Sequence, residues 1–194
     1  MATENTLLMR MARESLRGKW PLAIGTFLVY TLITCSFGAM RQAGVIGLLI
    51  AGPLALGAAM FSLDMSRGKE AKLERIFDGF RFFSKALVTY LLMLLYVILW
   101  LLLLIIPGII AALSYSMAFY ILADDTSLTP SQALEQSKKM MYGYKWKLFG
   151  LYMWFLLLSL LCILTLGVGF LWLVPYANIT LAKFYDDVKS IHLV

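Results

Sequence analysis

The sequence has little charge and few of the residue types that bind metals. Charged side chains make up 14% of its 194 residues, and it contains one histidine and two cysteines. Neither Cys35 nor Cys162 has neighbours at metal-ligand spacing, so both are interpreted as small apolar side chains, and no cofactor or metal is expected. Hydrophobic residues make up 61% of the chain, above the roughly 45–50% of a soluble domain. This excess predicts a membrane protein.

Long apolar stretches predict an all-α polytopic membrane protein. A span needs roughly 20 apolar residues, and the uncharged stretch at 86–123 is too long for one span, so Pro107-Gly108 is taken as its break. The piece after that break is short, so a tilted, shared or re-entrant helix is an alternative to a full span there. The six expected spans are 20–37, 44–65, 85–105, 107–123, 146–164 and 168–183.

The basic residues predict how the chain is oriented in the membrane. Lysine and arginine gather in cytoplasmic loops, and all of them except Arg41 fall on one side of the expected spans, together with every acidic residue. Both termini are therefore expected in the cytoplasm, with the chain crossing the membrane several times. The net charge is +6, and basic residues beside apolar runs suit anionic lipid headgroups better than nucleic acid.

The spans are expected to form three helical hairpins of common ancestry within one membrane domain, 1–194. Gly47 precedes Pro53 by the same distance as Gly169 precedes Pro175, and an aspartate follows each proline at equal spacing. The pseudo-repeats cover about 4–66, 68–125 and 129–190. The alternative is that any helix pair leaving the cytoplasm begins with lysine and an aromatic residue.

An amphipathic helix lying in the headgroup plane is expected before each hairpin. The third shows the clearest start, because Thr129 and Gln132 form a capping-box pattern around Pro130, with Gly143 as its stop. The alternative is an ordinary cytoplasmic helix packed on the bundle. The residues expected to contact lipid headgroups are Arg10, Arg13, Arg17, Lys19, Lys138, Lys139, Lys145, Trp146 and Lys147.

Polar and small residues within the spans give candidate packing sites. No ionisable residue lies in the middle of a span, which argues against proton-coupled or ion-coupled transport. Asn178, with Thr180 and Ser116 as further polar groups, is expected to join helices, and a ligand contact is its alternative. A row of small residues on the second span predicts close helix packing or a contact in a homo-oligomer: Gly47, Ala51, Ala55 and Ala59.

Four aspartates are expected near the cytoplasmic ends of the fourth and sixth spans: Asp124, Asp125, Asp186 and Asp187. Four carboxylates together suit Mg²⁺ or Ca²⁺. The favoured interpretation is that they end helices in water and pair with Lys138, Lys145 or Lys183. His192 stands alone in the tail and is expected to be solvated.

The second half of the sequence resembles a known family. The similarity spans about 107–188 and rests on Tyr-Ile-Leu-Ala-Asp at 120–124, Gly-x-Lys-Trp-Lys-Leu-Phe at 143–149 and Leu-Trp-Leu-Val-Pro-Tyr at 171–176. These motifs resemble bacterial integral membrane proteins of domain-of-unknown-function family 975. The resemblance implies a six-span protein of the bacterial inner membrane, and it brings no activity and no catalytic residues.

The sequence favours a non-enzymatic membrane protein, either permease-like, channel-like or a scaffold, with a basic cytoplasmic surface that contacts anionic lipid. One alternative is an enzyme or accessory protein that acts on lipid headgroups through the aspartates. Another is a pore-forming homo-oligomer built around the second span. No catalytic residue is assigned, and the sequence names neither substrate nor protein partner.

Overall fold

The computed structural model describes residues 3–39 and 44–192, and every regular element within them is helical. The elements are α1 (Asn5–Leu16), α2 (Trp20–Ala39), α3 (Gly44–Ser66), the 3-10 helix η1 (Leu73–Phe82), α4 (Phe83–Leu103), α5 (Ile105–Tyr115), α6 (Ala118–Asp124), α7 (Pro130–Met140), α8 (Lys145–Leu164) and α9 (Phe170–His192). The expected all-α fold is confirmed.

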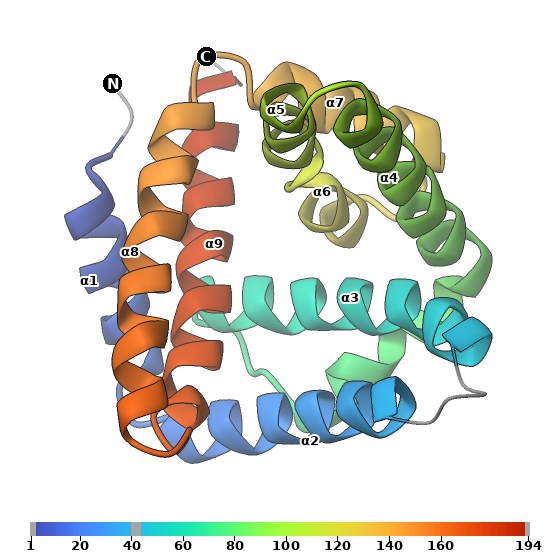
Figure 1. Ribbon diagram of the computed structural model, residues 1–194. Helices are drawn as coiled ribbons and strands as arrows, with labels where there is room; N and C mark the ends of the chain where they lie inside the picture. The colour runs from blue at the N-terminus through green and yellow to red at the C-terminus, as the bar shows by residue number, and fades with distance from the viewer. Residues whose placement is uncertain (1–2, 40–43, 193–194) are drawn as a thin grey trace.

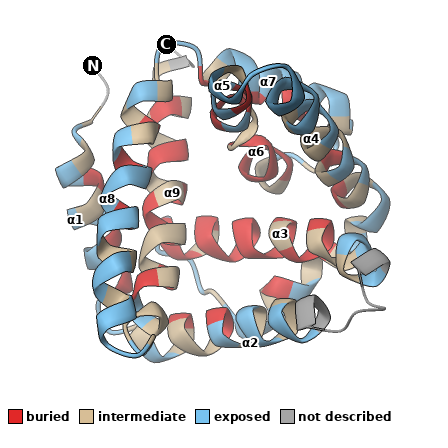
Figure 2. Cartoon of the chain, in the orientation of Figure 1, coloured by how far each residue is buried: buried red, intermediate tan, exposed pale blue. Residues whose placement is uncertain are grey.

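Helices α3, α6 and α9 form the centre of the protein, and the other helices lie around them (Figure 1). Buried residues concentrate on these three helices, whereas the outer sides of α4, α5 and α8 are exposed (Figure 2). The pair α2–α3 runs steeply across the direction of the pair α8–α9. The helix pairs therefore leave the centre in different directions and do not share one axis.

Four helical segments of the described chain are long and apolar enough to cross a membrane: Ile46–Ser66, Leu73–Leu103, Ile105–Asp124 and Lys145–Leu164. The apolar part of α2, Trp20–Ser36, is shorter. A membrane-embedded protein is supported, but the six-span arrangement is not confirmed. Arg41, the one basic residue expected on the outer side, lies outside the described residues.

The uncharged stretch around Pro107 is divided into separate helices, as expected, but not at the proline. Helix α4 ends at Leu103, Leu104 is extended (φ −163°), and Pro107 lies in the first turn of α5. A first-turn amide has no partner within its helix, so proline fits there without loss of a hydrogen bond. A second, unexpected break separates α5 from α6 at Ser116 and Met117.

A short helix precedes each of the pairs α2–α3, α4–α5 and α8–α9, as expected. The capping box at the start of α7 is confirmed, because the Thr129 hydroxyl accepts from the Gln132 amide and the Gln132 side chain accepts from the Thr129 amide. Each short helix packs on the centre through a buried face, for example Leu8 and Leu16 of α1 and Ile76 of η1. The buried faces of these short helices therefore pack on the bundle, and a position of their other faces in the headgroup plane stays a prediction.

The closest helix contact joins α3 to η1 through glycines. A Cβ on Gly57 would lie 1.8 Å from the carbonyl oxygen of Ile76, and one on Gly79 would lie 2.0 Å from that of Pro53. A Cβ on Gly52 would lie 2.6 Å from the carbonyl oxygen of Ala86, in α4. Since no side chain fits between these backbones, glycine is required at each position. This contact holds the second helix pair against α3.

Candidate functional site

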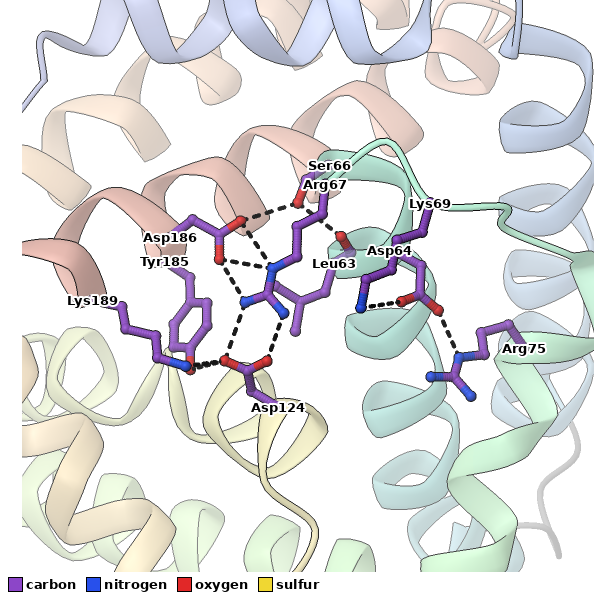
Figure 3. A network of polar contacts seen from close by, with 10 residues as sticks. All are labelled: Leu63, Asp64, Ser66, Arg67, Lys69, Arg75, Asp124, Tyr185, Asp186 and Lys189. Carbon is purple, nitrogen blue, oxygen red and sulfur yellow. Dashed lines mark hydrogen bonds and ion pairs between the residues drawn. The ribbon is translucent and has the colours of Figure 1, made fainter. Parts of the chain in front are cut away.

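The most concentrated group of charges lies where α3, α6 and α9 end, and Arg67 stands at its centre (Figure 3). Arg67 follows α3 directly, Asp124 ends α6, and Asp186 lies on α9. The guanidinium donates to Asp124 with its Nη1 at 2.6 Å and its Nη2 at 3.1 Å. It also donates to Asp186, with Nη2 at 2.7 Å and Nε at 3.1 Å. One arginine therefore joins three helices through paired hydrogen bonds.

Further donors from α9 complete this group. Tyr185 donates its hydroxyl to Asp124 at 3.1 Å, and Lys189 forms a second ion pair with the same carboxylate. The side chains of Arg67 and Asp124 are 28% and 15% exposed. The hydrogen bond with Asp124 is the main cause that raises the pKa of Arg67, and burial opposes it. We name Arg67, Asp124, Tyr185, Asp186 and Lys189 the Arg67 cluster.

A separate ion pair fixes the N-terminal segment. Lys147, at the start of α8, lies 2.7 Å from Asp187, which also accepts from the Thr3 amide. Burial opposes ionisation of Asp187, but the hydrogen bonds from Lys147 and Thr3 outweigh it and lower its pKa. A lowered carboxyl pKa stabilises the folded chain above the unfolded value of about 3.9, and this contribution is lost as the pH falls through the folded pKa.

The aspartates act in this arrangement as partners of basic residues. Asp124 and Asp186 converge, as expected, but their partners are Arg67 and Lys189, and Asp187 pairs with Lys147. The expected pairing with Lys138, Lys145 or Lys183 is wrong, since Lys183 donates to the Ser66 carbonyl instead. Asp125 accepts from Ser127 in a local turn. No set of metal-binding side chains gathers within the described residues.

The model of the family described as protein of unknown function (DUF975) matches residues 1–108 and 94–192. The chain belongs to this family. No curated protein and no solved structure matches it. The description of this family assigns no activity to its members.

The residues expected at lipid headgroups differ in their contacts. Arg10, Arg13 and Arg17 lie exposed along α1. Lys139 pairs with Glu135 at 2.7 Å, and Lys147 is turned inward toward Asp187. Lys19 reaches the Lys69 carbonyl, whereas Trp146 is 82% exposed. Lys138 and Lys145 form no ion pair within the described part of the chain.

The polar groups expected within the membrane bond to their own helix segments. Asn178 donates to the Val174 carbonyl at 2.9 Å, Thr180 to Tyr176 at 2.7 Å and Ser116 to Leu113 at 2.8 Å. The Asn178 side chain therefore bonds within α9 and not to another helix as expected, because the Val174 carbonyl one turn earlier lies within its reach. The Asn178 backbone carbonyl does accept from Tyr120 of α6, at 3.3 Å.

Two features of the helix packing have no simple sequence signal. Ser137 of α7 donates to the Ser114 carbonyl at 2.8 Å and accepts from the Met117 amide, so it satisfies the backbone at the break between α5 and α6. In the expected row of small residues on α3, Ala59 is buried, whereas Gly47, Ala51 and Ala55 are only half-buried. The tightest contact uses Gly52 and Gly57 instead.

Proposed function

We propose that this member of the family is a non-enzymatic scaffold of the bacterial cytoplasmic membrane that contacts anionic lipid through its basic surface. The supporting observation is the outward exposure of its most apolar helices. Only 11% of the most apolar part of Leu73–Leu103 and 17% of that in Lys145–Leu164 are buried within the protein. Apolar surface on this scale is stable where lipid covers it.

A scaffold is favoured over a carrier, a pore or a headgroup enzyme. The aspartates that an enzyme would use are held by Arg67, Lys189 and Lys147. The helix that a homo-oligomeric pore would place at its surface, α3, is 61% buried in its apolar part. The ion pairs of Arg67 with Asp124 and Asp186 hold the ends of α3, α6 and α9 in one arrangement. A scaffold needs such a rigid arrangement of its helices.

The pair α4–α5 is proposed to lie flat in the cytoplasmic leaflet of the membrane, where lipid covers its exposed apolar side, with the pair α8–α9 crossing the membrane and both termini inside. Helix α7 follows this pair from base to tip. At the base, Lys85 donates to the Thr126 carbonyl at 2.6 Å, just before α7. At the tip, Lys138 of α7 lines a pocket with Trp100 and Pro107. The outer side of α7 is polar and charged, so it does not suit the hydrocarbon core.

Cysteine labelling tests this arrangement. With Cys35 and Cys162 replaced by serine, Leu166→Cys is expected to react with a membrane-impermeant maleimide added outside, because the turn between α8 and α9 reaches the outer surface. Leu104→Cys and Lys138→Cys are expected to react only after the membrane is opened. Leu166 and Leu104 are 96% and 63% exposed in the protein, so membrane position decides their reactivity. External labelling of position 104 would instead support six spans.

Neutralising α1 tests the contact with anionic lipid. The variant Arg10→Gln/Arg13→Gln/Arg17→Gln is expected to lose at least roughly tenfold of its preference for phosphatidylglycerol over phosphatidylcholine, because each charge near an anionic surface contributes about 1 kcal/mol. The preference is measured from the lipid that co-purifies from mixed micelles. The matched triple lysine variant keeps the charge and is expected to keep the preference. An unchanged preference in the glutamine variant would refute the contact through α1.

A further inference from the structure

A groove lies between α5 and the connection from α7 into α8. Ile106, Ile109 and Ile110 line one side, and Trp146 and Phe149 of α8 line the other. Its volume is about 480 Å³, within the roughly 300–1,000 Å³ of sites for small molecules. Figure 1 shows the start of α5 beside this connection. Apart from Lys145, the side chains named here are apolar or aromatic, which suits a hydrocarbon chain.

Two lysines lie in the groove and in the pocket that adjoins it. Lys145 lines the groove and also an adjoining pocket of about 170 Å³, which Lys138 shares. Their neighbours in sequence are neutralised, since Lys139 pairs with Glu135 and Lys147 with Asp187. Neither Lys138 nor Lys145 has such a partner among the described residues. An apolar groove with one lysine in its lining and a second lysine in the adjoining pocket, neither of them in an ion pair of the described chain, complements an anion that carries a hydrocarbon chain.

We infer that the groove between α5 and α8 binds one anionic phospholipid, with an acyl chain against Ile106, Ile109 and Phe149 and the phosphate between Lys138 and Lys145. Trp146, which is 82% exposed, lies beside the expected headgroup, at the depth where tryptophan is enriched in membrane proteins. The inference rests on the proposed function and narrows its lipid contact to one site. The surface position proposed for α4–α5 brings the tip of this pair to headgroup depth.

Native mass spectrometry of the full chain in detergent tests this site with phosphatidylglycerol and phosphatidylcholine as probes. The wild type is expected to retain one phosphatidylglycerol per chain. Lys138→Gln/Lys145→Gln is expected to weaken that binding by roughly 30-fold, which corresponds to about 2 kcal/mol. Ile109→Trp, which fills the groove without changing charge, is expected to weaken it similarly. The controls are Lys69→Gln/Arg81→Gln for charge, since these side chains are 62% and 77% exposed and belong neither to the groove nor to α1, and Leu160→Trp, on an exposed part of α8, for bulk.

The outcomes separate this inference from the proposed function. Selective loss in the two groove variants supports the site. Equal loss in the groove variants and in Lys69→Gln/Arg81→Gln overturns the site and leaves a diffuse contact with anionic lipid. Equal retention of phosphatidylcholine also overturns the site. A dimer in place of bound lipid, lost in Ile109→Trp, would assign the groove to a second copy. No effect of any variant on lipid binding would overturn both the site and the lipid contact.

Discussion

Replacing Gly57 by alanine is expected to lower the midpoint of thermal unfolding in detergent strongly. The new Cβ would lie 1.8 Å from the Ile76 carbonyl oxygen and 2.5 Å from its carbon. Both are backbone atoms, so α3 and η1 must separate before the side chain fits. Overpacking typically costs about 1–3 kcal/mol where side chains can adjust, and a backbone contact is expected to reach or exceed the upper end of that range.

The matched control is Gly25→Ala on α2, where an added Cβ has no heavy atom within 4 Å. Alanine is favoured over glycine within a helix by about 1 kcal/mol, so this variant is expected to melt at or slightly above the wild-type temperature. Circular dichroism in detergent measures both. Gly79→Ala tests the same contact from η1 and is expected to behave like Gly57→Ala. If Gly57→Ala melted like Gly25→Ala, α3 and η1 would not approach as closely as described.

The sequence predicted where most helices begin and end, because apolar runs bounded by charged or turn-forming residues determine those limits locally. Helices α2, α3 and α8 agree closely with the expected runs. The contacts between helices were harder to predict. Gly57 carries no signal of its own, since its importance depends on the position of Ile76 on another element. Likewise, the apolar run through Ser116 gives no sign of the break that Ser137 stabilises. The directions of the helix pairs depend on the same long-range contacts.

The candidate site was predicted in part, for the same reason. Aspartates at the ends of helices indicated that Asp124 and Asp186 would meet, because both follow long apolar segments. Arg67 was not singled out, since in the sequence it is one of several basic residues after α3. Its role follows from its position directly after α3, where its side chain lies between Asp124 of α6 and Asp186 of α9 (Figure 3). Lys138 and Lys145, which are closer in sequence to Asp124, form no ion pair with it, whereas Lys189 of α9 does.

Replacing Arg67 by glutamine is expected to be the most destabilising change of a charged residue in this region. It leaves Asp124, at 15% exposed, and Asp186, at 29%, without their shared partner. Exposed ion pairs contribute about 0–1 kcal/mol, whereas removing one partner of a buried pair costs about 3–5 kcal/mol. The partial burial here predicts a loss of roughly 2–4 kcal/mol. Arg67→Lys keeps the charge but not the paired hydrogen bonds, so an intermediate loss is expected.

Arg81→Gln is the matched control, because Arg81 is 77% exposed and lies 4.0 Å from Asp78. It removes the same charge and is expected to leave the melting temperature nearly unchanged. A mutant cycle then separates repulsion from lost contacts. If Arg67 acts by joining the helices, adding Asp124→Asn and Asp186→Asn to Arg67→Gln will recover part of the stability, since two facing carboxylates no longer repel each other. Equal melting temperatures for Arg67→Gln and Arg81→Gln would show that the ends of α3, α6 and α9 are held by apolar packing alone.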